Sequence, residues 1–391
     1  MSTIADAGLL ADLRRLGATD ISACYSCGTC TAVCPLSDNA GTFPRRMIRY
    51  AQVGMKDALL GSKELWTCYQ CGLCSERCPT QANPMQFMAA ARRLAIASYD
   101  RTRLAWTMYT QPVFGYFMAV LLAAFFALFL YSFHGGQSAD TLALFGFIPE
   151  PLIHYTGIGV GVAVLLLAIL GIANMARKIA KREGVGLGTL FGGREALGRT
   201  LRALWVAVGI ESIGLKRYRN ECDEVQEPEP WYRRRWVAHG ATMWGFLGLL
   251  AATILDYGLS LIGVRATGAW VPVWYPVRLL GTVAGIVMIT GLSVLIINRL
   301  QGSNRAAQES LGSDWLLLVL LWVTGVSGFL VELGLYLPHA PGWAYWVFLC
   351  HVSVAMDLGL LTPFIKFAHI FYRPVALFFY VLAREASAAA S

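Results

Sequence analysis

Six apolar stretches, each near or above about 20 residues, occupy most of this chain after residue 103,. They lie at roughly 109–133, 152–175, 237–262, 277–298, 315–336 and 343–371. Inside a bilayer every backbone polar group must be satisfied within the protein, and an α-helix achieves this for a stretch of that length. The chain is 56% hydrophobic and only 14% charged. The sequence therefore predicts a bundle of membrane-spanning helices and excludes an ordinary soluble protein.

Lysine and arginine are unevenly distributed among the loops between these stretches. The 176–236 loop is rich in them, whereas 134–151 and 337–342 contain none, and 263–276 contains Arg265 alone. Positive residues stay on the cytoplasmic side of a membrane. We therefore predict a multi-pass protein of the cytoplasmic (inner) membrane, with both termini in the cytoplasm. The N-terminal residues lack the pattern of a signal peptide. The net charge of +8 is explained by topology and anionic lipid, so we expect no nucleic-acid partner.

Eight of the ten cysteines fall into two copies of the motif C-x2-C-x2-C-x3-C-P. The copies are Cys24, Cys27, Cys30 and Cys34 before Pro35, and Cys68, Cys71, Cys74 and Cys78 before Pro79. In two-cluster ferredoxins with this spacing, the fourth cysteine of each run ligates the other [4Fe–4S] cluster. The predicted ligand sets are Cys24, Cys27, Cys30 and Cys78 for one cluster, and Cys68, Cys71, Cys74 and Cys34 for the other. Zinc, the alternative, normally uses separated C-x2-C pairs.

The segment between the two cysteine motifs has the spacing of a helix. The apolar residues that recur at this spacing behind Pro44 are Met47, Ile48, Ala51, Met55, Ala58 and Leu59,. Together with the stretches CYSCGTCTAVCP, FPRRMIRYAQVG and ELWTCYQCGLCSERCP, this makes residues 20–90 resemble the all-helical, two-cluster ferredoxin component of heterodisulfide reductase. The resemblance implies an all-α cytoplasmic head, which we place at residues 1–103.

Histidines in membrane spans are candidates for function, because an ionisable side chain is costly there. His351 and His369 are 18 residues apart in the last predicted span, and five helical turns put them on one face, roughly 27 Å apart. One of them then lies near each membrane surface, as a two-haem wire requires, although Pro363 between them can bend the helix. His239 opens the third span at the depth of His369, so we expect this pair to hold an inner haem b.

The outer haem is expected to use His351 together with a second histidine near the outer surface. His154, at the outer end of the second span, is the preferred partner, and His134 is the alternative,.

Residues 351–375, HVSVAMDLGLLTPFIKFAHIFYRPV, resemble the last helix of the gamma subunit of respiratory nitrate reductase, a di-haem cytochrome b that oxidises quinol. The resemblance implies axial haem ligands at His351 and His369. It also implies two ligands ten residues apart on an earlier helix, where His239 matches the first and Leu249 stands at the second. The family pattern therefore supplies no second ligand for the outer haem.

The combination of these two parts resembles the membrane subunit of quinone-interacting membrane-bound oxidoreductase complexes. This resemblance implies soluble partner subunits with flavin and iron–sulfur clusters, an indirect link to adenylylsulfate reductase, and menaquinone or ubiquinone as substrate. The predicted fold is all-α, with a helical two-[4Fe–4S] ferredoxin domain at 1–103 and a six-helix transmembrane di-haem cytochrome b bundle at 104–391. Within the basic cytoplasmic loop at 176–236, residues 194–214 separate arginines from apolar residues, which predicts a helix on the membrane or on a partner.

Four ionisable residues are candidates for a quinone site. Asp256, Arg278 and Glu332 lie near the outer ends of spans, and Asp357 lies six residues beyond His351. Quinol oxidation releases protons, and buried ionisable groups either reach water or serve protons and haem propionates. We therefore place the quinone near His351.

Two other interpretations stay open. One is a membrane subunit linked to heterodisulfide or sulfite reductase, and the other is a redox-sensing transporter, although the sequence has no inverted repeat.

Overall fold

The computed structural model describes residues 5–390 except 38–41, 139, 224–229, 267, 304, 338 and 340. These described residues form helices joined by loops, and no β-strand occurs among them. Six of the helices are long and apolar enough to cross a membrane, which is the number that the apolar stretches predict. The predicted all-α fold with six candidate spans is therefore confirmed.

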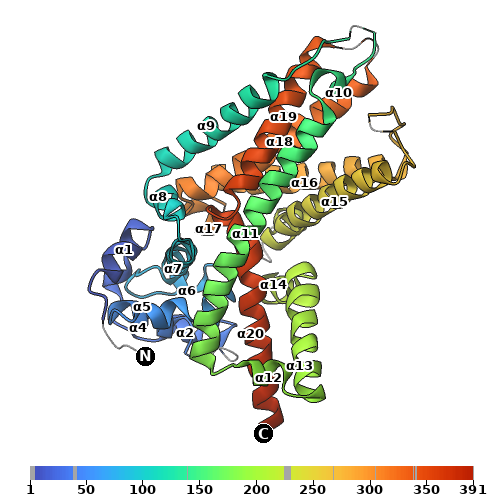
Figure 1. Cartoon of the computed structure of the whole chain (residues 1–391). Helices are drawn as coiled ribbons and strands as arrows, with labels where there is room; N and C mark the ends of the chain where they lie inside the picture. Colours follow the sequence, from blue (N-terminus) through green and yellow to red (C-terminus); the bar gives the residue numbers. More distant parts are fainter. Residues whose placement is uncertain are drawn as a thin grey trace.

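The N-terminal head consists of short helices and turns around the cysteine motifs (Figure 1). They are α1 (Leu9–Arg15), η1 (Ile21–Ala23), α2 (Thr29–Ala32), α4 (Arg45–Gln52), α5 (Lys56–Leu60), η2 (Lys63–Trp66), α6 (Leu73–Glu76) and α7 (Pro84–Tyr99). The predicted helix between the motifs is divided into α4 and α5, because the chain turns at Gly54 with a φ of 72°. Asn83 caps the N-terminus of α7, and its side chain accepts a hydrogen bond from the Gln86 amide,. Its buried face forms the centre of the head.

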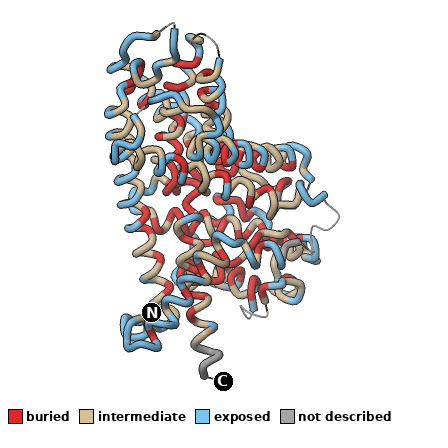
Figure 2. The backbone as a smooth tube through the Cα atoms, turned by 90° about the vertical axis from the view of Figure 1, so that its right-hand side faces the viewer, coloured by how far each residue is buried: buried red, intermediate tan, exposed pale blue. Residues whose placement is uncertain are grey.

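The six candidate spans are α9 (Pro112–Tyr131), α11 (Glu150–Glu183), α15 (Arg235–Leu261), α16 (Pro276–Leu300), α18 (Gly312–Tyr336) and α19 (Gly342–Leu361). They expose large apolar side chains, with Val113 80%, Leu128 70% and Ile254 61% accessible. Figure 2 shows the exposed residues along the outer helices and the buried ones toward the middle of the molecule. Soluble proteins rarely expose such large apolar surfaces, whereas lipid tails cover them in a membrane.

The remaining helices connect the spans and extend the bundle toward the head. They are α8 (Leu104–Thr110), α10 (Leu144–Phe147), α12 (Leu187–Phe191), α13 (Arg194–Trp205), the π-helix η3 (Val206–Ile213), α14 (Lys216–Asp223), η5 (Trp231–Arg233), α17 (Arg305–Gln308), η6 (Lys366–Ala368) and α20 (His369–Ala390). The end of α11 passes the head and contacts α5 and α7 (Figure 1). The predicted amphipathic segment 194–214 is helical as α13 and η3, and both pack on α20.

The predicted sixth span, 343–371, is wrong at its C-terminal end. The helix α19 ends at Leu361, and His369 begins the separate helix α20. Pro363 follows the end of α19, and a proline disfavours continuation of a helix, because it lacks the amide hydrogen and its ring clashes with a preceding carbonyl,. His351 and His369 therefore do not lie on one face of one helix, and the predicted separation of five helical turns does not apply.

The helices α15 and α16 approach each other closely at two glycines. A Cβ atom at Gly245 would lie 2.5 Å from the amide nitrogen of Met288, and one at Gly291 would lie 2.7 Å from the carbonyl oxygen of Ala238. These neighbours are backbone atoms, which cannot move aside as a flexible side chain does. Small residues at such crossings allow membrane helices to gain contact area and packing energy.

Replacing Gly245 with Leu is therefore expected to force α15 and α16 apart and to destabilise the protein by roughly 1–3 kcal/mol or more, as overpacking does. The thermal unfolding midpoint of the detergent-purified protein measures this loss. Gly258→Leu in the same helix is the control, because a Cβ atom there meets no atom within 4 Å. Equal destabilisation by both substitutions would contradict the close-packing account.

A buried ionic network joins the head to the bundle. Asp314, at the start of α18, lies 2.9 Å from Arg93 of α7 and 2.9 Å from Lys366 of η6. Arg93 also donates a hydrogen bond of 2.8 Å to the carbonyl of Leu16. The side chains of Arg93 and Asp314 are only 7% and 6% exposed. Breaking a buried pair by removing one partner is strongly destabilising, so this network fixes the head against the bundle.

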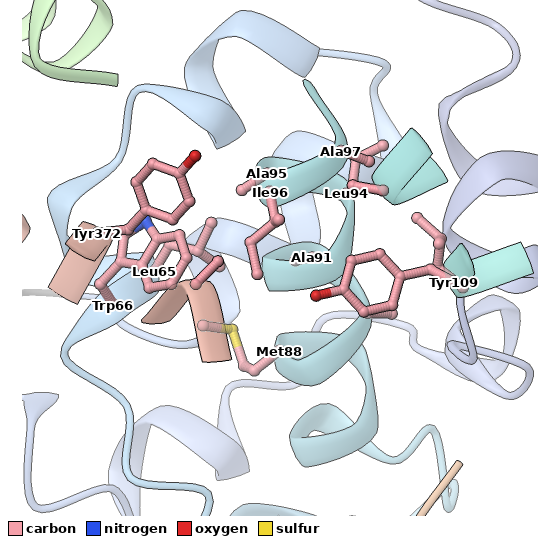
Figure 3. Packing of buried hydrophobic residues seen from close by; sticks show 14 of the residues in the cluster. Leu65, Trp66, Met88, Ala91, Leu94, Ala95, Ile96, Ala97, Tyr109 and Tyr372 are labelled. Carbon is pink, nitrogen blue, oxygen red and sulfur yellow. The ribbon is translucent and has the colours of Figure 1, made fainter. Parts of the chain in front are cut away.

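Aromatic packing reinforces the same junction. In Figure 3, Tyr372 of α20 packs beside Trp66 of the head. Their ring centres are 5.5 Å apart, and those of Tyr372 and Tyr99 are 5.2 Å apart. Tyr99 in turn donates a hydrogen bond to the carbonyl of Leu60. Such ring pairs contribute beyond the area they bury, and here they hold α20 against the head.

Candidate redox site

Two cavities in the head each collect four cysteines. The first is lined by Cys24, Cys27, Cys30 and Cys78. The second is lined by Cys34, Cys68, Cys71 and Cys74. Each cavity thus combines three cysteines of one motif with the last cysteine of the other. This exchange follows from the packing of α2 against α6, which brings each motif's end beside the other motif.

The two motif loops repeat one unusual backbone conformation. Ser26 and Gln70, at matching positions, have φ values of 67° and 56°, and Gly28 and Gly72 have φ values of 92° and 98°. Turns of this kind direct successive amide hydrogens toward a common point, where they favour an anionic group. In the second loop the Gln70 amide donates to the Cys68 sulfur across 3.3 Å. Hydrogen bonds to cysteine sulfur adjust the potential of iron–sulfur clusters.

The surroundings of the two cavities differ. Tyr25, beside the first cavity, is 64% exposed, whereas Tyr69, at the matching position of the second loop, is 7% exposed. Burial raises the pKa of Cys30 to about 11 and that of Cys34 to about 12. These thiols are therefore protonated at neutral pH in the metal-free protein, and they must release protons on binding iron.

His239 and His369 come together near the second cavity. The first lies in the first turns of α15 and the second begins α20, and their ring centres are 6.3 Å apart with an angle of 55° between the planes. The Nδ1 atom of His369 is 2.7 Å from the carbonyl oxygen of Lys366, which leaves its Nε2 atom available. Among the described residues, the buried Nδ1 atom of His239 has no hydrogen-bond partner.

A tyrosine pair connects the histidines with the second cavity. Tyr218 of α14 packs edge-on against His239, with ring centres 5.6 Å apart. On its other side it stacks on Tyr69 at 5.1 Å, and Tyr69 adjoins Cys68 in the chain. Sequence analysis did not identify Tyr218. No motif or spacing marks this residue, and only the folding of the 176–236 loop brings it to the site.

The histidines predicted near the outer surface are not in contact with one another. The Nδ1 atom of His351 lies 3.1 Å from the Ser327 hydroxyl and 3.0 Å from the Thr324 carbonyl, both on α18. His154 pairs with Glu150 at 2.9 Å and packs on Tyr257. His134 stacks on Tyr131, with ring centres 4.1 Å apart. In the described part of the chain, no ring contact joins His351 to either predicted partner.

The four quinone-site candidates have different surroundings. Asp256 forms an ion pair with Arg265. Glu332 accepts a hydrogen bond of 2.5 Å from Thr282, which lies one helical turn beyond Arg278 on α16. Asp357 is fully buried, and neither of its carboxylate oxygens has a hydrogen-bond partner among the described residues. Asp256 and Glu332 therefore have partners within the protein, whereas Asp357 has a free polar group in the bundle.

Comparison with known proteins identifies the cysteine-rich part of the head. The family of 4Fe-4S dicluster domains matches residues 20–82, which include all eight motif cysteines. The chain is also similar to citrate utilization protein B of Escherichia coli, with 31% identity over 159 residues, or 40% of this chain and 39% of that protein. No solved structure matches the chain. The chain thus contains a 4Fe-4S dicluster domain joined to six helices suited to a membrane.

Proposed function

We propose that this chain transfers electrons between a membrane quinone and soluble partner subunits, using haem b and two [4Fe–4S] clusters. The observation that carries the proposal is the pair of His239 and His369, 6.3 Å apart, beside the second cysteine cavity. The dicluster domain supplies the cofactors of one-electron transfer at the head,. A haem at the histidine pair extends this path into the membrane.

The histidine pair has the properties that a haem site needs. Their ring centres are 6.3 Å apart, a separation at which both imidazoles would be able to hold one haem iron,. The bond from Nδ1 of His369 to a backbone carbonyl orients the ring for binding through Nε2, as is usual for metal-bound histidine,. The unpartnered buried nitrogen of His239 is a polar atom that a bound group can satisfy,.

Each residue set has a distinct part in the proposed mechanism. The eight motif cysteines hold the clusters, in the two sets that line the cavities. His239 and His369 hold the inner haem, and haem and clusters supply the one-electron chemistry. Tyr69 and Tyr218 fill the space between the histidines and the second cavity and exclude water from it. An outer haem at His351, with His154 as preferred second ligand and His134 as alternative, belongs to the same proposal.

The quinone site is proposed to lie near His351 and Asp357 in α19. Quinol oxidation releases protons, and a carboxylate with two unpartnered oxygens can accept one,. Asp357 follows His351 by six residues, which is about 9 Å along a helix,. Asp256 is paired with Arg265, and Glu332 accepts a hydrogen bond from Thr282. Asp357 is therefore the strongest of the four candidates for the quinone site.

The proposed partners are soluble flavin- and iron–sulfur-containing subunits of the same complex, and through them adenylylsulfate reductase. The support for this choice is the resemblance of the two halves to the membrane subunit of such complexes. The quinone is menaquinone or ubiquinone, and the location is the cytoplasmic membrane, with both termini and the head on the cytoplasmic side. The basic loops support this orientation,.

A second candidate keeps the same electron path but changes the soluble partner. The similarity to citrate utilization protein B favours a partner that acts in the utilisation of citrate. Identification of the proteins that co-purify with the full-length chain separates the two candidates.

Purified protein mixed with a short-chain quinol under anaerobic conditions is expected to show reduced b-type haem bands, followed by an electron paramagnetic resonance signal from reduced clusters. Asp357→Asn is expected to slow haem reduction by quinol at least tenfold while leaving reduction by dithionite unchanged, because proton transfer typically contributes 10²–10⁴-fold. Asp256→Asn is the control. Purified protein without haem bands would contradict the proposed haem. An Asp357→Asn variant whose haem is reduced by quinol at the original rate would contradict the proposed quinone site.

A further inference from the structure

The second motif loop, Cys68–Cys71, is held by three arginines that come from three different elements. Arg92 of α7 donates to the carbonyl of Leu65 at 2.9 Å and to the carbonyl of Cys68. Arg235 of α15 donates to the carbonyl of Gln70 at 2.6 Å. The guanidinium of Arg373, on α20, lies 4.5 Å above the ring of Tyr69. These contacts bring three positive charges beside one cluster-binding loop.

Two of these arginines are placed by the helices that carry the histidine pair. Arg235 precedes His239 by four residues in α15, and Arg373 follows His369 by four residues in α20. Residues four apart lie on one face of a helix. Each helix therefore presents a histidine and, one turn away, an arginine directed to the second loop. The junction that positions the histidines thus also positions the charges.

The first cavity has a different electrostatic environment. Its described lining includes one charged side chain, Arg45, which is exposed to solvent, whereas the three arginines at the second motif loop contact that loop from outside the lining of the second cavity. Water and salt screen an exposed charge, whereas a buried or half-buried charge acts through a less polarisable medium. Arg92, Arg235 and Arg373 are all half-buried. Three half-buried positive charges therefore contact the second motif loop, whereas the charge in the described lining of the first cavity is one exposed arginine.

We propose that Arg92, Arg235 and Arg373 raise the reduction potential of the second cluster above that of the first. On reduction a [4Fe–4S] cluster takes up one electron without making or breaking a bond, so its net charge becomes more negative by one. Nearby positive charge stabilises the reduced form, and net charge is one of the determinants of cluster potential. The inference rests on the cluster part of the proposed function. It gives the cluster beside the histidine pair the greater affinity for an electron.

The test is a redox titration of the full-length protein in detergent, with dithionite as the reductant and electron paramagnetic resonance as the readout. Cys27→Ser and Cys71→Ser variants assign the signals to the first and second cluster. Arg235→Gln and Arg373→Gln are each expected to lower the equilibrium constant for reduction of the second cluster by about tenfold. This is the size of effect expected when a charge about 10 Å from the cluster is removed at an effective dielectric constant of about 20. For one electron this is a shift of about 59 mV. The first cluster is expected to keep its potential.

Charge-conserving variants separate this role from a merely structural one. Arg373→Lys keeps the charge but loses the planar group on Tyr69, so most of the original potential is expected to remain. Arg14→Gln, at an exposed position on α1, is the remote control. An unchanged potential of the second cluster in both Gln variants would overturn the proposal. Equal shifts in the potentials of both clusters would also overturn it, as would a second-cluster potential in Arg373→Lys as low as that in Arg373→Gln. The titration needs neither haem nor quinone, so it succeeds or fails independently of the haem and quinone assignments.

Discussion

Replacement of Cys34 by Ala is expected to remove the second cluster and to leave the first. Cys34 belongs to the first motif by sequence, but it lines the second cavity together with Cys68, Cys71 and Cys74. A cluster that loses one of its four thiolate ligands is held less tightly and is expected to be lost. Cluster iron is therefore expected to fall from about eight to about four atoms per chain, and iron and sulfide analysis measures the change.

The corresponding substitution in the second motif makes this test specific for one cluster. Cys78→Ala is expected to remove the first cluster instead, because Cys78 lines the cavity of Cys24, Cys27 and Cys30. Cys350→Ala is the control for loss of a thiol, since Cys350 is an exposed free cysteine on α19. If Cys34→Ala abolished the signal of the first cluster alone, the crossed arrangement would be refuted.

Replacement of His239 or His369 by Ala is expected to remove the proposed inner haem, one haem per chain, and to leave both clusters in place. Each substitution deletes one of the two residues that would hold the haem, and it leaves a space where the half-buried imidazole stood,. The reduced-minus-oxidised absorption spectrum and the haem content of the purified protein measure the loss. Electron flow from quinol to the clusters is expected to stop in both variants.

His339→Ala is the matched control, because His339 lies in the loop between α18 and α19. It is expected to keep its full haem content. Full haem content in both the His239 and the His369 variant would exclude this pair as the haem site, whereas loss of haem in only one would show that the other is not a ligand.

Much of the cysteine arrangement follows from sequence spacing, because ligand spacing within a motif is a local property of the chain. The repeated motif predicts two clusters and the exchange of Cys34 and Cys78, and the two cavities collect the cysteines in those sets. The six spans are likewise visible as apolar stretches, because the bilayer requires a minimum helix length,. The proximity of His239 and His369 follows from their matched depth and from the resemblance to a di-haem cytochrome.

Other features depend on packing between segments far apart in the chain. Tyr218 reaches the site only because the 176–236 loop folds back on the head and the bundle, and its sequence neighbours give no sign of this. The contacts of Arg235 and Arg373 with the second loop have the same origin. Pro363 indicates the break after Leu361, but the apolar residues continue beyond it, so the sequence does not show where the helix ends.

The network of Arg93, Asp314 and Lys366 has a consequence for biogenesis. The ribosome synthesises the head first. Asp314, the partner of Arg93 in α18, lies 221 residues further along the chain, and Lys366 follows the last span. Until then the guanidinium has no carboxylate, and an unpaired charge at a buried position is strongly destabilising. We therefore expect the nascent head to remain incompletely folded during translation. We expect it to mature only when the last spans have been inserted, so that membrane integration precedes completion of the head.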